Sequence, residues 1–280
     1  MTLYVTKADG SRQPFQKDKI IRTCLRMNAT LSEAQSIADK IEARIYDGIP
    51  TKEILKMIFR YMKKYRPAVK HQIDLREAIA RLRPKPDFEI YVGLILKSLG
   101  YKTKHNLILN GKCVDHEIDV VAWKGSEILY VEVKHHFNPH TYTGLDVFLE
   151  VNSTFNDLKE GFRLGKQPYN FSKALVVCNT KVSEHGRRYA ECRKIEHIGW
   201  KYPPGEALED IIEKYKLYPI TMLKELTPSV EALLADRGIL TLKDLINKRP
   251  SDISKRVGIP TRQIKELQSK AVEILEGKGK

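Results

Sequence analysis

The chain has 280 residues, of which 42% are hydrophobic and 30% charged, and this composition favours two or three folded domains over a disordered chain. No apolar run approaches the roughly 18 residues of a membrane span, and the first residues lack an apolar signal core, so we expect neither membrane insertion nor secretion. The four cysteines lack Cys-x-x-Cys spacing, which argues against a disulfide scaffold or a zinc ribbon and favours a cytoplasmic location.

Positive charge is concentrated toward both ends of the chain. Residues 1–86 contain 19 Lys and Arg against 9 Asp and Glu, residues 87–217 contain 18 of each, and residues 218–280 contain 12 against 8. Basic ends favour polyanionic partners, either nucleic acid or nucleotide phosphates. A lysine-rich surface that serves only solubility is the alternative.

Residues 1–83 are predicted to form a short hairpin followed by helices. The dipeptide Asp9-Gly10 is typical of a hairpin turn. Ser32 followed by Gln35 has the spacing of a capping box at the start of a helix. Helices are expected at about 18–27, 32–47, 51–64 and 69–82, before a proline-rich linker at 83–86.

Two short runs and one lysine in this segment form a recognisable pattern. The runs are VTKADGS at residues 5–11 and YDGIPT at residues 46–51, and Lys19 lies between them. The segment resembles the ATP-cone, the regulatory nucleotide-binding domain of ribonucleotide reductases and of their repressor. Because it contains neither a Walker A loop nor a G-x-G-x-x-G motif, we expect nucleotide to be sensed rather than hydrolysed.

The resemblance implies that ATP or dATP binds here as an allosteric ligand. Lys7 and Lys19 would contact the phosphates, and Thr51 would lie near the nucleotide at a helix start, where free backbone N–H groups favour anions. Ala8 stands where many ATP-cones have arginine, so one cationic contact is missing. A basic helical module that binds nucleic acid is the alternative interpretation. The predicted nucleotide-binding residues are Lys7, Asp9, Gly10, Lys19 and Thr51.

Residues 84–217 have the alternating character of a mixed α/β layer domain. Asp87 has the position of an N-cap before an apolar helix that ends at Gly100. Strands are expected at about 101–109, 116–123, 127–135, 174–179 and 196–200, and further helices at about 143–160 and 183–192.

The most specific chemical pattern joins Asp119 on one predicted strand to Glu132 and Lys134 on the next. Residues i and i+2 of a strand share a face, so Glu132 and Lys134 project together, and the tight connection at 124–126 brings Asp119 beside them. Neighbouring carboxylates repel unless a hard divalent cation lies between them, and oxygen ligands suit Mg²⁺. A water on such an ion can become a nucleophile, while the lysine stabilises phosphate charge. Glu89 on the preceding helix could supply another carboxylate.

The same residues match the motif of the PD-(D/E)-x-K nucleases. The sequence around them resembles the Mrr-like restriction-endonuclease branch of that superfamily, which implies a metal-dependent phosphodiesterase core. On this resemblance Glu89 is the helical acid, Asp119 and Glu132 bind Mg²⁺ or Mn²⁺, and Lys134 is the catalytic lysine. The roles of three flanking histidines are left open between a phosphate contact, a proton relay and simple packing. These residues are His116, His135 and His136.

Residues 218–280 are predicted to form a small all-α module. The GILTLKDL run at 238–245 and the VGIP run at 257–260 resemble helix–hairpin–helix units. Such hairpins present backbone N–H groups to phosphate, which implies DNA binding without sequence readout. The first hairpin, at 226–229, lacks the glycine that permits close backbone approach. A structural or protein-docking module is the alternative.

The predicted fold is therefore multidomain. It combines a mainly α N-terminal ATP-cone at 1–83, an α/β restriction-endonuclease-like core with a mixed sheet at 84–217, and a small all-α module at 218–280. The predicted function is a nucleotide-regulated, Mg²⁺-dependent DNA endonuclease that hydrolyses phosphodiester bonds, with no membrane partner. Cutting both strands would be consistent with a homodimer. The alternatives are a non-catalytic, nucleotide-responsive DNA-binding regulator and a nuclease that acts on RNA.

Overall fold

The computed structural model of the protein describes residues 2–27 and 29–276, and in it the chain divides into two compact units. The first unit is discontinuous and combines the residues up to Asp74 with those from Ile220 onward. The second unit is the continuous segment Leu75–Pro219. None of the described helices combines the length and hydropathy needed to cross a bilayer.

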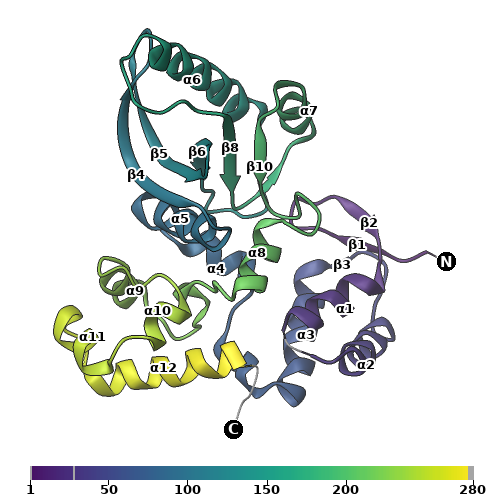
Figure 1. Ribbon diagram of the computed structural model, residues 1–280. Coiled ribbons are helices and arrows are strands. Elements are labelled where there is room, and N and C mark those ends of the chain that lie inside the picture. The colour runs from purple at the N-terminus through teal and green to yellow at the C-terminus, as the bar shows by residue number, and fades with distance from the viewer. Residues whose placement is uncertain (1, 28, 277–280) are drawn as a thin grey trace. The chain divides into compact units, whose positions relative to one another are not determined.

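The N-terminal part of the first unit is a small sheet covered by helices (Figure 1). The predicted hairpin is confirmed, and a third strand that was not predicted runs parallel to its first strand. Ile20, Ile37 and Met62 pack into the core that these elements enclose. The elements are β1 (Tyr4–Thr6), β2 (Arg12–Pro14), α1 (Lys17–Arg26), α2 (Leu31–Glu42), β3 (Ile49–Pro50) and α3 (Thr51–Tyr65).

The start of α2 differs from the prediction. The capping box consists of Thr30 and Glu33, not of Ser32 and Gln35, because the chain is already helical from Leu31. The Thr30 hydroxyl accepts from the Glu33 backbone N–H at 3.3 Å, and the Glu33 carboxylate accepts from the Thr30 N–H at 2.7 Å. The helix also ends earlier than predicted, at Glu42.

The helix predicted at 69–82 is wrong. The chain instead forms a short 3-10 helix, η1 (Pro67–His71), an extended stretch, and then α4 (Leu75–Arg81), which belongs to the second unit. Long-range backbone pairing interrupts the helical pattern, because Gln72 forms an antiparallel bridge with Leu223. Helix-favouring residues are thus overruled by a partner about 150 residues away.

This pairing also joins the two parts of the first unit. The Ile73 N–H donates to the Met222 carbonyl at 3.0 Å, and the Lys224 N–H donates to the His71 carbonyl at 2.9 Å. The His71 ring adds a contact with Glu225, with Nδ1 lying 3.0 Å from the carboxylate. The segments that leave and re-enter the first unit therefore run side by side.

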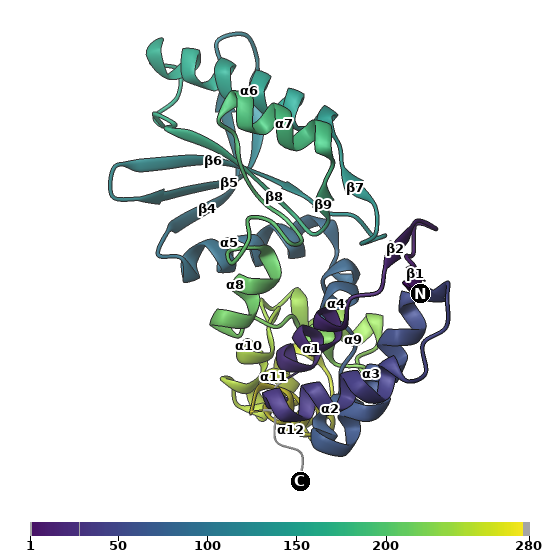
Figure 2. The same cartoon turned by 90° about the vertical axis from the view of Figure 1, so that its right-hand side faces the viewer.

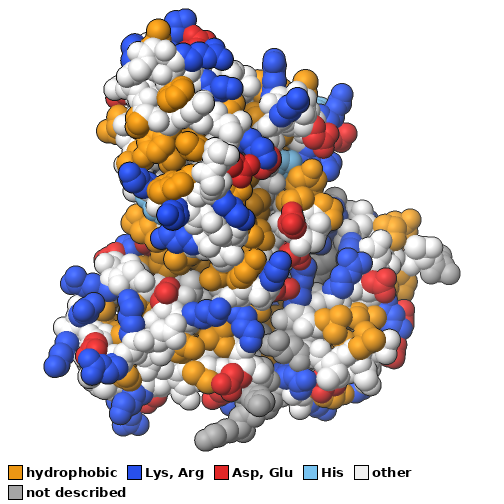
Figure 3. Space-filling model, in the orientation of Figure 1, with side chains coloured by type: hydrophobic (Ala, Val, Ile, Leu, Met, Phe, Trp, Pro, Cys, Tyr) orange, Lys and Arg blue, Asp and Glu red, His pale blue; other side chains and the backbone are white. Residues whose placement is uncertain are grey.

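The C-terminal part of the first unit is helical, as predicted. Gly258 ends α11 in a left-handed conformation at φ +71°, and Gly238 takes φ +69° in the turn before α10. Lys and Arg side chains are frequent on the face of this region that Figure 3 shows. The elements are η3 (Ile220–Met222), α9 (Pro228–Ala235), α10 (Leu242–Ile246), α11 (Pro250–Val257) and α12 (Thr261–Glu276).

The second unit is built on a five-stranded mixed sheet with strand order β10-β8-β6-β5-β4. The pairs β4–β5 and β5–β6 are antiparallel, and β8 and β10 continue the sheet in parallel with β6. The strands are β4 (Lys102–Asn110), β5 (Asp115–Lys124), β6 (Glu127–Lys134), β8 (Lys173–Cys178) and β10 (Glu196–Ile198). A two-stranded sheet of β7 (Tyr142–Thr143) and β9 (Lys181–Val182) was not predicted.

Helices cover both faces of this sheet (Figure 2). One face carries α5 (Glu89–Ser98) and α8 (Leu208–Tyr215), and the other carries α6 (Leu145–Arg163) and α7 (Glu184–Arg193). The near-continuous apolar run of β8 reflects burial on both faces. The predicted multidomain fold, with its mixed-sheet α/β core and helical C-terminal region, is confirmed.

The entry to α5 differs from the prediction in a way that matters for the site. Asp87 caps no helix, because its buried carboxylate accepts two hydrogen bonds from the Arg83 guanidinium at 2.6 and 2.9 Å. The expected linker is instead a structured part of the second unit, with a helical turn, η2 (Pro84–Phe88), leading directly into α5. Lys85 is held in this turn beside the sheet.

Candidate functional site

The structure brings the four residues predicted to be catalytic to one end of the sheet. Val120 pairs with Val131, and the next step of that antiparallel register sets Asp119 opposite Glu132. The Asp119 carboxylate also accepts from the Val133 N–H at 2.9 Å, which fixes its orientation across the two strands. Glu89 is the first residue of α5 and is buried beside the same carboxylate.

Glu132 and Lys134 project from the same face of β6, as the alternation of side chains along a strand predicts. Lys134 Nζ lies 2.9 Å from Glu132 Oε1, and the Tyr130 hydroxyl donates to Glu132 Oε2 at 2.8 Å. Burial lowers the pKa of Lys134, but the Glu132 hydrogen bond and the nearby Glu150 and Asp119 carboxylates raise it overall. The amine therefore stays protonated at neutral pH, which suits a charge stabiliser better than a base.

A second cluster, centred on Lys85, escaped the sequence prediction. The Lys85 ammonium lies 2.9 Å from Glu117 Oε1, 3.3 Å from Glu89 Oε1 and 3.5 Å from Asp119 Oδ1. Three carboxylates from one helix and one strand thus share a single positive charge. The i, i+4 spacing of Lys85 and Glu89 was the only sequence signal for this contact.

The carboxylate oxygens of this end of the sheet fit a hard divalent cation. Among the described residues no three His, Cys, Asp or Glu side chains converge as a ready-made metal site, since Lys85 lies between the carboxylates instead. Glu89 Oε2 is nevertheless buried without a hydrogen-bond partner, and such an atom is costly unless a ligand satisfies it. An all-oxygen donor set is the one that Mg²⁺ and Mn²⁺ prefer.

The electrostatics of Glu89 are strongly perturbed. Burial raises the pKa of Glu89 to about 7, the Asp119 carboxylate adds to the rise, and Lys85 opposes it. Because the folded-state pKa exceeds that of the unfolded chain, the protein binds an extra proton on folding between about pH 4.5 and 7. The stability associated with that proton is present at low pH and is lost as pH rises through about 7.

We therefore expect Glu89→Gln to stabilise the metal-free protein at about pH 8, by on the order of 2–3 kcal/mol, because it removes the cost of a buried charge. The gain should vanish near pH 4.5, where wild-type Glu89 is protonated. Urea unfolding in a chelator at both pH values measures the difference. A variant that is less stable than wild type at about pH 8 would contradict this assignment.

The three flanking histidines lie in different surroundings. His116 lies near the start of β5, and its Nε2 is 2.8 Å from Oδ2 of Asp157 on α6. His135 Nε2 lies 3.1 Å from the Ile79 carbonyl, on the α5 side of the sheet. The His136 backbone N–H donates to the buried Asn179 side chain at 2.8 Å, and burial lowers the pKa of the His136 ring.

The predicted nucleotide-binding residues also gather in one place. β1 and β3 run in parallel with Thr6 opposite Pro50, so Lys7 and Thr51 follow at adjacent positions. Asp9 and Gly10 form the hairpin turn, in which Asp9 accepts from the Ser11 N–H and hydroxyl and Gly10 takes φ +79°. These two residues shape the loop that carries Lys7.

Three cations lie close together at this site, and the Asp9 carboxylate of the hairpin turn lies near one of them, Lys7. Burial lowers the pKa of Lys19, and the positive charges of Lys7 and Arg22 lower it further. In the described part of the chain, neither Lys7 nor Arg22 forms an ion pair. An electropositive cluster of this kind favours a polyanionic ligand such as a triphosphate. Arg22, one helical turn after Lys19, was missed from sequence.

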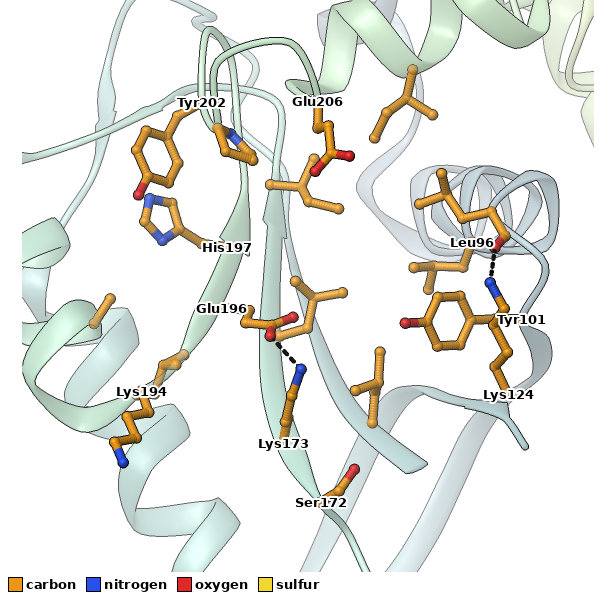
Figure 4. A pocket seen from close by; sticks show the side chains of 18 of the residues that line it. Leu96, Tyr101, Lys124, Ser172, Lys173, Lys194, Glu196, His197, Tyr202 and Glu206 are labelled. Atoms are coloured by element: carbon orange, nitrogen blue, oxygen red, sulfur yellow. Dashed lines mark hydrogen bonds and ion pairs between the residues drawn. The ribbon is translucent and has the colours of Figure 1, made fainter. Parts of the chain in front are cut away.

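A separate cavity of about 1010 Å³ lies at the other end of the second unit's sheet (Figure 4). It is lined by the last turn of α5 near Leu96, and Lys173 pairs with Glu196 at 2.7 Å in its wall. The His197 ring stacks on Tyr202 at 4.2 Å, and burial lowers the pKa of His197 to about 4. None of the four residues predicted to be catalytic lines this cavity.

Comparison with known families agrees with this architecture. A restriction endonuclease family matches residues 80–199, the ATP cone domain family matches residues 3–78, and a family described as AF1548-like, C-terminal, matches residues 218–275. The chain thus joins an ATP cone to a restriction endonuclease domain of the Mrr type and an AF1548-like C-terminal domain. The predicted resemblances to the first two families are confirmed.

Two similar proteins extend the comparison. An uncharacterized protein of Archaeoglobus fulgidus is 34% identical over 181 residues, which are 65% of this chain and 98% of that protein. The crystal structure of the protein of unknown function AF1548 shares 29% identity and a TM-score of 0.59, covering 73% of this chain and all of that one. The present chain belongs to the same family as the A. fulgidus protein.

Proposed function

We propose that the protein is a nucleotide-regulated, metal-dependent DNA endonuclease. The observation that carries the proposal is the convergence of Asp119, Glu132, Lys134 and Glu89 at one end of a mixed sheet that matches the restriction endonuclease family. The basic C-terminal helices and the cation cluster around Lys19 supply binding surfaces for DNA and for nucleotide phosphates, respectively.

Each residue of the site has a distinct part in this proposal. Asp119 and Glu132 would hold Mg²⁺ or Mn²⁺, with the unpartnered Oε2 of Glu89 as a further oxygen donor. The bound ion would supply Lewis acidity and a water of lowered pKa. Lys134, held by Glu132, places a fixed positive charge where negative charge develops on the scissile phosphate. Lys85 neutralises the carboxylates when no cation is bound.

A direct test is a cleavage assay of full-length protein on plasmid and linear DNA, with Mg²⁺ or Mn²⁺ and with a chelator control. Parallel reactions with and without ATP and dATP measure regulation, and an RNA of the same sequence measures substrate class. Nicking or cutting of DNA that requires the metal supports the proposal. DNA binding without cleavage under all these conditions would favour a nucleotide-responsive DNA-binding regulator instead.

The nucleotide site makes its own prediction. Lys7→Ala should weaken ATP and dATP binding by roughly ten-fold or more, since a charge-assisted phosphate contact contributes on the order of 1.5–3 kcal/mol. Calorimetry measures this change in affinity. The full chain is used because residues 1–74 share a compact unit with the C-terminal helices. The nucleotide-free cleavage rate should not change, while any response to nucleotide should disappear.

A matched control is Lys63→Ala, which removes an exposed lysine near the end of α3, away from the Lys7 and Lys19 cluster. This variant should bind nucleotide as wild type does. If wild-type protein shows no heat of binding with either nucleotide, and the Lys7 variant instead loses salt-dependent DNA affinity, then the N-terminal domain is a DNA-binding module.

A further inference from the structure

The segment that follows the proposed catalytic strand displays an aromatic ring to solvent. Phe137 comes three residues after Lys134, and 73% of its surface is exposed. Tyr142, at the other end of the same loop, is 46% exposed. Both aromatic side chains thus lie in the loop that directly follows the strand of the proposed catalytic lysine.

The backbone that carries Phe137 is firmly held. The Asn179 side chain, only 1% exposed, accepts from the His136 N–H and donates to the His136 carbonyl, both at 2.8 Å. His136 Nε2 also lies 3.3 Å from the buried Thr143 hydroxyl. The residue directly before Phe137 is therefore bonded through its amide, its carbonyl and its ring.

The ring of Phe137 rests on a second support. It meets the His135 ring edge to face, with centroids 5.4 Å apart, and His135 in turn packs on the buried Phe88 at 5.0 Å. His135 Nε2 is 3.1 Å from the Ile79 carbonyl, which fixes the imidazole between these neighbours. The exposed Phe137 ring is thus supported by His135 and, through it, by Phe88 in the core of the second unit.

The far side of the loop is tied down as well. The Arg76 guanidinium donates to the Pro139 carbonyl and approaches His140 Nδ1 at 3.1 Å. The Thr143 and Thr180 hydroxyls are 2.8 Å apart where β7 meets β9. A rigid loop presents its aromatic ring with little entropy left to lose on binding.

We propose that Phe137 is a stacking platform for a nucleobase displaced from its helical stack beside the scissile phosphate. This inference rests on the proposed nuclease function and names its substrate class: DNA with an unpaired base next to the cut is preferred over fully paired duplex. A phenyl ring has no hydrogen-bonding group, so it stacks on any base, and recognition depends on DNA structure rather than sequence. Lys134 and the bound metal would contact the adjacent phosphate.

Binding experiments with the cleavage-inactive Asp119→Asn protein test this without turnover. The two probes are one duplex with a single bulged 2-aminopurine and the same duplex fully paired. Phe137→Ala should lower affinity for the bulged duplex by about ten-fold and change affinity for the paired duplex by less than about two-fold. The 2-aminopurine quenching on binding should disappear in Phe137→Ala and persist in Phe137→Trp.

The control variant is Leu149→Ala, which removes an exposed apolar side chain from α6 and should change neither probe. Equal losses on both duplexes, or unchanged quenching in Phe137→Ala, would overturn the stacking role while leaving the nuclease proposal intact. If wild-type protein binds and cuts neither DNA, the nuclease proposal itself fails. If Phe137→Ala alters no DNA property but changes self-association, the ring belongs to a protein interface.

Discussion

Asp119→Asn and Glu132→Gln should each reduce metal-dependent DNA cleavage to the level of a protein-free control, because each removes a negative charge that the proposed metal requires. Both substitutions keep the shape of the side chain. An asparagine can still accept from the Val133 N–H, and a glutamine can still accept from the Tyr130 hydroxyl, so the fold should be retained. Gel assays of cleavage and calorimetry of Mg²⁺ binding measure the two effects.

The matched control for these variants is Glu127→Gln. Glu127 lies at the other end of β6 and pairs with Lys173 at 3.1 Å, so its charge should not affect the proposed metal. This variant should cleave DNA at the wild-type rate. Full cleavage by both the Asp119 and the Glu132 variants, with unchanged metal dependence, would show that the assigned site is wrong.

Lys134→Ala should lower the cleavage rate by roughly 10²–10³-fold, on the order of 3–4 kcal/mol, while DNA affinity changes little. The reason is that its positive charge acts on negative charge that develops only during the reaction. Metal affinity should not weaken, since an ammonium is no metal ligand. Single-turnover kinetics and metal titration separate the two quantities.

Lys173→Ala provides the comparison for this lysine. Lys173 is also held between two carboxylates, Glu127 and Glu196, but at the opposite end of the sheet. Its loss should leave the rate of cleavage unchanged. A loss of metal binding in the Lys134 variant would instead mean that the lysine organises the carboxylates and takes no part in the chemical step.

The central sheet and the motif on it were accessible from sequence because their signals are local. Alternation along VEVK assigns Glu132 and Lys134 to one face, and the short connection before Glu127 leaves antiparallel pairing with the strand of Asp119 as the simple solution. The helix of Glu89 follows from its continuous apolar run. Each of these inferences spans fewer than about 20 residues, a range over which spacing translates into geometry.

The features that were missed depend on contacts between distant parts of the chain. Lys85 looked like a linker residue, because nothing local indicates that the Pro84–Phe88 turn places its ammonium beside Glu117 and Asp119. The broken helix before α4 arises from pairing between Gln72 and Leu223. The two corrected caps have a simpler cause. The Thr30 hydroxyl accepts from the backbone at the start of α2, a role that the sequence pattern assigned to Ser32. The Asp87 carboxylate, which was expected to cap α5, instead accepts from Arg83.

The pairing of Gln72 with Leu223 also bears on the order in which the protein folds. Forming that bridge closes a loop that contains all 145 residues of Leu75–Pro219. If this loop were still unfolded, closure would cost about 4 kcal/mol in chain entropy, more than a few backbone hydrogen bonds return. A folded insert holds its own two ends at a fixed separation and removes most of that penalty. The restriction endonuclease domain is therefore expected to fold first, and the discontinuous unit to assemble around its ends afterwards.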